Sequence, residues 1–285
     1  MIITMIESGA QALVEAITGE FAKLPAVTAV VLSGSSGSGY SDAGSDIDLY
    51  VYAVHEPPKA WRAGLARKFG EHASIGNDFW EPGDEWVALR TGSVVDIMYR
   101  TPAWIEQQLD RVLLQHQASV GYSTCLVYNV LHSNIMHDRG EWFAALRAKA
   151  AQPYPEPLRR AIIARNHPVL RSTLSSYAHQ ITTALQRNDL TSVNHRVTAL
   201  LASYFDIIFA INRAFHPGEK RLVAQVLANC PRRPPDFAAQ VHGLLSAIAP
   251  AGRTDVPARV DDLLDGLDAL LVEERLIAPG ARRRK

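Results

Sequence analysis

Asp46 and Asp48 stand at the start of the apolar segment 47–54 and could hold metal ions beside a phosphate. Residues i and i+2 of a strand point the same way, so both carboxylates share one face while Ile47 and Leu49 turn into the core. Two such carboxylates repel, and hard divalent cations, above all Mg²⁺, neutralise such a pair next to phosphates. A solvated strand face explains alternating acids equally well, so the pair alone leaves both interpretations open.

A loop of small residues, G-S-S-G-S-G, begins at Gly34 and precedes the two aspartates. Gly34 and Gly39 have the spacing of a P-loop, but Tyr40 follows where that loop needs a Lys. The glycine spacing also misses the dinucleotide-binding fingerprint. A flexible linker is the remaining alternative, yet an apolar strand leads directly into this loop and an acid-bearing strand follows it. We therefore expect a loop that binds phosphate.

A third carboxylate, Asp96, lies inside the apolar run Val94–Met98, where a charged side chain is costly unless it serves a purpose. Three carboxylates on neighbouring strands beside a phosphate loop form the ligand set of a two-metal phosphoryl or nucleotidyl transfer site. Asp96 would ligate metal or accept a proton from the attacking hydroxyl. The expected catalytic and metal-binding residues are therefore Asp46, Asp48 and Asp96.

These residues resemble the motif of the DNA polymerase beta-like nucleotidyltransferase superfamily, in which Gly-Ser is followed about ten residues later by Asp, an apolar residue, Asp and an apolar residue. Gly34-Ser35 and Asp46-Ile47-Asp48-Leu49 match it, and the resemblance covers about residues 25–100. It implies two Mg²⁺ ions held by the aspartates and a nucleoside triphosphate, with ATP as the leading choice. The triphosphate-binding residues that it implies in this segment are Gly34, Ser35, Ser36 and Ser45.

Ser36 is a departure, because small members of the family often have a basic residue there. Phosphate charge would then come from the helical part of the chain, as helical residues contribute in the similar aminoglycoside and lincosamide nucleotidyltransferases. Lys220 is the best candidate, since a helix expected to start at Glu219 would place it at a helix N-terminus, where positive charge is unfavourable. An exposed loop between helices explains Lys220 as well.

The elements that must position these residues change in type near residue 102. Before it, helical spacing over 6–24 is followed by β-branched runs, with Pro57–Phe69 as a crossover helix and Glu81, Asp84 and Glu85 in a loop. The expected strands are Val27–Leu32, Ile47–Val54, a segment around Ser74–Ile75, and Trp86–Arg90 joined by a hairpin to Val94–Tyr99.

After Thr101, the expected N-cap of a helix, almost everything is expected to be helical. Pro168 is expected to kink or split the fourth of these helices. The fold class is therefore α+β: a small mixed sheet with flanking helices over 1–102, then an all-α bundle over 103–285 that completes the nucleotide and acceptor cleft. The expected helices cover 102–117, 119–134, 141–150, 157–187, 190–215, 219–229, 236–248 and 257–277.

Composition restricts the partners. Lys plus Arg and Asp plus Glu both total 29, so no global charge favours nucleic acid or an acidic membrane, and a long nucleic acid partner is disfavoured. Only Cys125 and Cys230 occur, which implies neither a disulfide framework nor a cysteine zinc site and fits a reducing cytoplasm. No signal peptide or membrane span is predicted.

The expected function is transfer of a nucleoside monophosphate to a hydroxyl of a small-molecule acceptor, with release of pyrophosphate. An aminoglycoside-like antibiotic is one candidate acceptor, by resemblance. Two alternatives remain open: adenylylation of a protein or RNA acceptor, as in toxin-type relatives, and a catalytically silent nucleotide-binding module.

Overall fold

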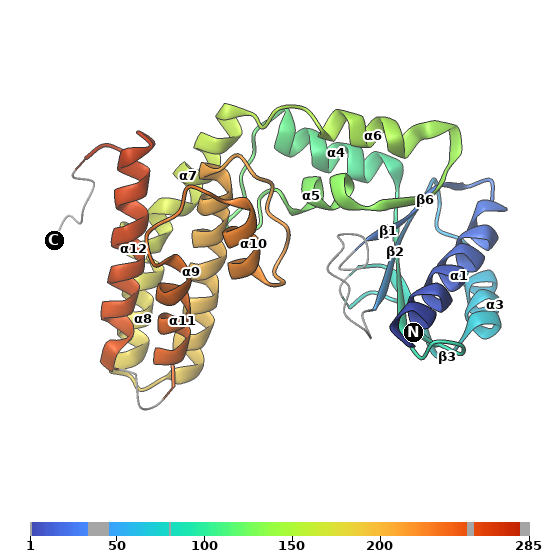
Figure 1. Cartoon of the computed structure of the whole chain (residues 1–285), viewed down its shortest axis with the longest axis horizontal. Coiled ribbons are helices and arrows are strands. Elements are labelled where there is room, and N and C mark those ends of the chain that lie inside the picture. Colours follow the sequence, from blue (N-terminus) through green and yellow to red (C-terminus); the bar gives the residue numbers. More distant parts are fainter. Residues whose placement is uncertain (1, 34–45, 80, 250–253, 280–285) are drawn as a thin grey trace. The chain divides into compact units, whose positions relative to one another are not determined.

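The computed structural model describes residues 2–33, 46–79, 81–249 and 254–279, which form two compact units. The first unit contains Met1–Asp110 and Asn129–Gln152, and the second contains Arg111–Tyr128 and Pro153–Lys285. The chain therefore leaves the first unit after Asp110 and returns to it before it finally enters the second. Figure 1 follows this path by colour.

A six-stranded sheet forms the centre of the first unit, in the order β3-β4-β5-β2-β1-β6. The pair β2 and β5 is parallel and the other four pairs are antiparallel. The sheet is therefore mixed, as the α+β prediction requires. The strands are β1 (Val27–Ser33), β2 (Ile47–Ala53), β3 (Gly70–Asn77), β4 (Gly83–Ala88), β5 (Val94–Arg100) and β6 (Asn134–Asp138).

Helices α1 (Ile2–Ala22) and α3 (Lys59–Phe69) pack against the apolar face of this sheet. Apolar residues at helical spacing in α1, such as Ile17 and Phe21, are fully buried there. In β2 the residues Ile47, Leu49 and Val51 alternate toward the same core. The predicted alternation is confirmed, and it turns Asp48, the one acidic residue of β2, to the opposite face.

Strand β4 begins at Gly83, three residues before the expected start, so the loop predicted for Asp84 and Glu85 is wrong. Asp84 is completely buried on the side of α3, where its carboxylate accepts hydrogen bonds from Arg62 Nη1 (2.8 Å), Tyr99 Oη (2.7 Å) and Gly76 N (2.8 Å). Glu85 is exposed on the other face, because successive strand residues alternate.

Helix α4 (Pro102–Leu113) begins as predicted, since Thr101 Oγ1 accepts a hydrogen bond from Trp104 N at 3.2 Å. The helix expected over 119–134 is wrong at both ends, because only Cys125–His132 is helical (α5). Residues Asn134–Asp138 form β6, which pairs with β1 at the edge of the sheet. Five residues carry too little periodicity to indicate a strand, and β6 is defined by its long-range partner.

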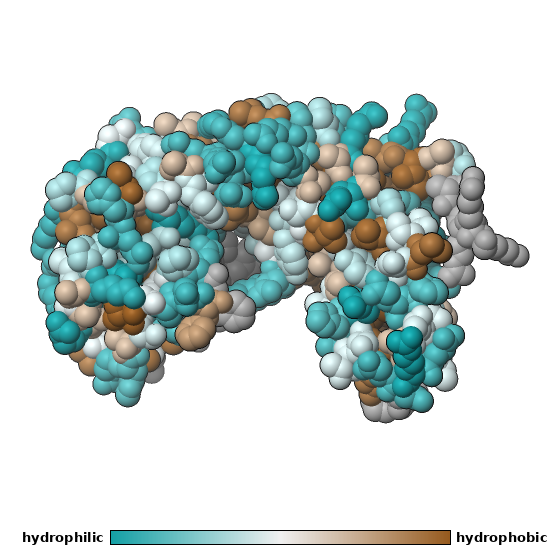
Figure 2. All heavy atoms as spheres, turned by 180° about the vertical axis from the view of Figure 1, so that it is seen from behind, coloured by the Kyte–Doolittle hydropathy of each residue, from teal (hydrophilic) through white to brown (hydrophobic). Residues whose placement is uncertain are grey.

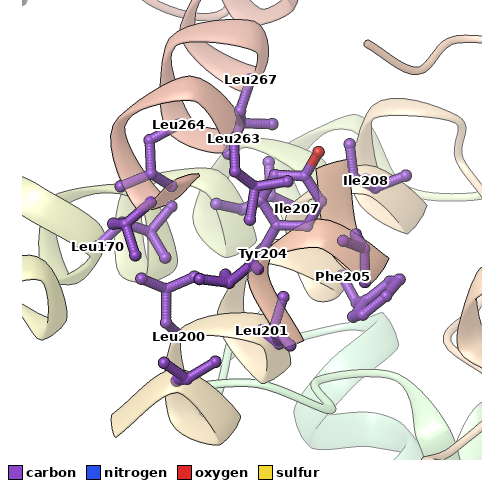
Figure 3. Close-up of a cluster of buried hydrophobic side chains, with 14 of the residues drawn as sticks. Leu170, Leu200, Leu201, Tyr204, Phe205, Ile207, Ile208, Leu263, Leu264 and Leu267 are labelled. Carbon is purple, nitrogen blue, oxygen red and sulfur yellow. The ribbon is translucent and has the colours of Figure 1, made fainter. Parts of the chain in front are cut away.

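The described regular elements of the second unit after Pro153 are all helices, and they pack side by side as a bundle (Figure 1). Figure 3 shows its core, where side chains of α7, α9 and α12 meet, among them Leu170, Tyr204 and Leu264. The helix predicted over 157–187 is split as expected, but not at Pro168, which lies inside α7: the break falls between Arg171 and Tyr177. The other helices of the described residues are α6 (Trp142–Ala150), which belongs to the first unit, α7 (Glu156–Arg171), α8 (Tyr177–Gln186), α9 (Leu190–Ile211), α10 (Leu222–Asn229), α11 (Phe237–Ala247) and α12 (Val256–Glu273), with a 3-10 turn at Arg139–Glu141.

The surface seen in Figure 2 is mostly hydrophilic, and hydrophobic residues lie there in small separate patches. The most exposed large apolar side chains, Leu174 and Phe79, belong to different units. No helix in the described part of the chain has the length and apolar character that a membrane span requires.

Asp206 of α9 fixes the segment that precedes α5. Its buried carboxylate accepts hydrogen bonds from Ser123 N (3.1 Å), Ser123 Oγ (2.6 Å) and Asn166 Nδ2 (3.2 Å). Asn166 Oδ1 in turn accepts a hydrogen bond from Gly121 N at 2.9 Å. Residues 119–123 are thus held on α7 and α9 as a turn, in which Gly121 and Tyr122 have positive φ, and the predicted helix cannot form there.

This network predicts a pH-dependent stability. Burial raises the pKa of Asp206 to about 6, although hydrogen bonds from Ser123 and Asn166 act in the opposite direction. Between about pH 4 and pH 6 the folded protein binds a proton that the unfolded chain has released, so the free energy of unfolding falls as pH rises through this window. In the Asp206→Asn variant the side chain is an amide, so the folded protein does not bind this proton. The stability of the wild type relative to the variant should fall by about 2–3 kcal/mol between about pH 4 and pH 7, as measured by urea unfolding. A difference that stays constant with pH would contradict this role of Asp206.

Candidate active site

The register of the sheet brings Asp48 and Asp96 side by side. They are direct partners on the parallel strands β2 and β5, and partners on adjacent strands share a face at a backbone separation of about 5 Å. Asp46, two residues before Asp48, is exposed where the described chain resumes. Its charge acts on Asp96, so the three aspartates singled out in the sequence lie near one another at this end of the sheet.

Glu85 and Ser33 extend this row of side chains, which sequence reasoning did not anticipate. Glu85 of β4 pairs with Asp96, and Ser33 of β1 pairs with Asp48. The acidic row thus consists of Glu85, Asp96 and Asp48 on three neighbouring strands, and Ser33 follows on a fourth. Ser33 Oγ also accepts a hydrogen bond from Asn129 Nδ2 of α5. The alternation of residues along β4 could have indicated the position of Glu85, but only with the strand starting at Gly83.

The acids around Asp96 oppose its ionisation. Asp96 is about half buried, and its pKa is raised first by burial and then by the charges of Glu85, Asp46 and Glu81. A carboxyl group that sits among other carboxylates is easier to ionise when a cation lies beside it. The acidic row therefore has the electrostatic character of a cation site.

The donors of the acidic row fit Mg²⁺ chemically, because they are all carboxylate oxygens. In the part of the chain that the structure describes, however, no group of three or more His, Cys, Asp or Glu side chains is already arranged to hold a metal ion. The backbone positions of Asp48 and Asp96 are fixed by the sheet, whereas each side chain has several staggered rotamers. Closing the site around an ion would therefore require rotation of these side chains and no change in the register of the sheet.

Arg100 lies on the same face of β5 as Asp96, but its charge is matched by Glu81. Its Nε and Nη2 donate to the Glu81 carboxylate at 2.8 and 2.6 Å, and its guanidinium lies 3.9 Å from the centre of the Tyr50 ring. Burial opposes its charge, yet Glu81 keeps the pKa of Arg100 above its usual value. Arg100 therefore ties β5 to β2 beside the acidic row rather than neutralising it.

The expected triphosphate-binding residues Gly34, Ser35, Ser36 and Ser45 lie outside the described residues. The structure does place the two ends of their loop. Strand β1 ends at Ser33, and the chain is described again from Asp46, two residues before the partner of Ser33 in the sheet. The loop predicted to bind phosphate therefore starts and ends at the acidic row.

Lys220 is exposed, but the predicted helix start at Glu219 is wrong, because α10 begins at Leu222. The loop before it is fixed by buried His216, whose N donates to Thr124 Oγ1 at 2.7 Å and whose Nδ1 accepts from Gly218 N at 3.1 Å. Burial lowers the pKa of His216 to about 4. Lys220 belongs to the second unit and the carboxylates to the first, and its role toward phosphate stays a prediction.

Similarity to known proteins is limited. Residues 123–222, less than half of the chain, match a family described as a domain of unknown function (DUF4037). A solved structure of a nucleotidyltransferase-like protein from Exiguobacterium sibiricum 255-15 is similar at 15% identity and a TM-score of 0.44, over 94% of this chain and 76% of that chain. No curated protein compared with the chain matches it. These similarities do not identify an activity.

Proposed function

We propose that this protein is a Mg²⁺-dependent nucleotidyltransferase that moves a nucleoside monophosphate, AMP from ATP in the leading case, to a hydroxyl of a small-molecule acceptor. The register pairing of Asp48 with Asp96 on parallel strands carries this proposal, together with Asp46 two residues before Asp48. Carboxylates that converge from neighbouring strands suit the two-metal type of phosphoryl transfer. The loop between Ser33 and Asp46 has the small residues that a bound triphosphate needs close to the backbone.

In the proposed reaction the acceptor oxygen forms a bond to the α-phosphorus, and the bond from that phosphorus to the bridging oxygen of pyrophosphate breaks. When bound, the Mg²⁺ ions would lower the pKa of the hydroxyl and neutralise phosphate charge. Asp46 and Asp48 would hold the ions through their carboxylate oxygens. Asp96 would either complete the ligand set or take the proton of the hydroxyl, a role that its raised pKa supports.

Transfer of label from α-labelled nucleotides tests this function. The protein would be incubated with Mg²⁺ and α-labelled ATP, GTP, CTP or UTP against panels of aminoglycosides, lincosamides, tRNA and cell lysate. We expect label on a small hydroxyl-bearing acceptor and pyrophosphate in equal amount, both abolished when EDTA removes the metal. Label on a protein or on RNA would replace the acceptor class but keep the reaction.

Two results would contradict this proposal. Saturable binding of a nucleoside triphosphate with no transfer to any acceptor would favour a catalytically silent nucleotide-binding module and contradict the proposed enzyme. Transfer that continues unchanged after EDTA treatment would contradict the role of the metal, because the carboxylates would then have no cation to hold.

A further inference from the structure

We infer that the second unit carries an anion-binding groove that takes a phosphate group, either free or on a small organic molecule. The groove lies between α8 and α9 near the turn that joins them, and its volume is about 440 Å³. That volume lies within the range of small-molecule sites. The groove is formed within the second unit and does not depend on the proposed nucleotidyl transfer.

Two arginines supply the positive charge of the groove. Arg187 at the end of α8 and Arg196 on α9 both line it. Among the described residues, neither guanidinium has a carboxylate within ion-pair distance, whereas Arg171 and Arg159 of the same unit pair with acids of α12 and its C-terminal end. Two exposed arginines that face a common hollow without such partners attract an anion.

The one acidic side chain in the lining is already engaged. Asp189 caps α9, where its carboxylate accepts hydrogen bonds from Ser192 Oγ and from Ser192 N (3.0 Å). These bonds lower the pKa of Asp189, and the charge of Arg187 contributes to the same effect. Two arginines and one aspartate leave the groove with a net charge of +1.

The lining residues are spaced to meet a phosphate from both helices. His179, Thr183 and Arg187 recur every four residues on α8, and Ser192 and Arg196 do the same on α9. Guanidinium groups offer paired N–H donors that match the oxygens of a phosphate, and the hydroxyl of Thr183 offers a further donor. Apolar lining is also present, and an organic body could rest against it.

Isothermal titration with two probes tests the groove. Inorganic phosphate and phenyl phosphate would be titrated into the full chain without divalent metal, so that the carboxylates of the first unit do not contribute. We expect saturable binding that weakens about tenfold in Arg187→Gln and in Arg196→Gln, because each removes charge-assisted hydrogen bonds. The double variant should show no saturable binding. Tighter binding of phenyl phosphate would indicate an organic phosphate as ligand, and equal affinity would indicate free phosphate.

Arg259→Gln is the matched control, because Arg259 is an exposed arginine on α12 outside the groove. It should bind both probes with wild-type affinity. The proposal is overturned if the wild type shows no saturable binding, or if the double variant binds as tightly as the wild type. Circular dichroism of each variant separates a binding defect from a folding defect, and exposed arginine positions of this kind tolerate Gln well.

Discussion

Replacement of Asp48 by Asn is expected to lower the rate of Mg²⁺-dependent pyrophosphate release by about 10³-fold. Asn keeps the shape of the side chain but removes the charge that would hold the metal beside the phosphates. Loss of about 4 kcal/mol of transition-state stabilisation corresponds to this factor. Asp96→Asn should have an effect of the same order, because Asp96 is the direct partner of Asp48 across β2 and β5. A coupled assay for pyrophosphate measures both variants.

Glu71→Gln provides the control for this prediction. Glu71 is an exposed acid of the same sheet, on β3 and outside the acidic row. It should retain wild-type activity, so that a general change in surface charge cannot explain the loss in Asp48→Asn. If Asp48→Asn kept the wild-type rate, the acidic row would have no part in the chemistry.

Replacement of Arg62 by Met is expected to destabilise the first unit by about 3–5 kcal/mol. Arg62 and Asp84 form an ion pair of 2.8 Å in which each side chain is only 1% exposed. Without Arg62 the Asp84 carboxylate remains buried with its charge uncompensated, although Tyr99 and Gly76 still donate to it. Because Asp84 belongs to β4, the change also loosens the strand that positions Glu85. Urea unfolding followed by tryptophan fluorescence measures the loss.

Two further variants decide whether the buried charge is the cause. Lys68→Met removes one of the two exposed lysine partners of Glu20, and a surface ion pair of this kind contributes about 1 kcal/mol or less. Arg62→Met combined with Asp84→Asn should recover part of the lost stability, because Asn carries no charge. If Arg62→Met cost no more than Lys68→Met, the ion pair would not be what holds β3, β4 and α3 together.

The sequence was sufficient to predict strands β1, β2 and β5 and the face of β2 on which Asp48 lies, because apolar alternation within one strand is local information. The pairing of Asp48 with Asp96 could not be predicted to the residue. Those positions are joined by a long crossover through α3, β3 and β4, and register in such a sheet is set by packing across the whole unit.

Three other features depended on contacts that no short window of sequence contains. Strand β4 starts three residues earlier than predicted, so Asp84 lies in the strand and not in a loop. Its partner Arg62 lies 22 residues earlier in the chain, outside any short window of sequence. Strand β6 forms by antiparallel pairing with β1 at the edge of the sheet. The turn before α5 exists because Asp206, 83 residues away, binds Ser123. Long-range partners override local propensity in each case.

Counting bound Mn²⁺ by electron paramagnetic resonance, with a non-hydrolysable ATP analogue present, tests the central claim most directly, because it reports the metal site independently of the acceptor. The acidic row predicts two Mn²⁺ ions per wild-type chain in the presence of the analogue, and at least one fewer in Asp48→Asn. Glu71→Gln should bind as many ions as the wild type. Equal Mn²⁺ binding by the wild type and Asp48→Asn would contradict the assignment of the acidic row as a metal and nucleotide site.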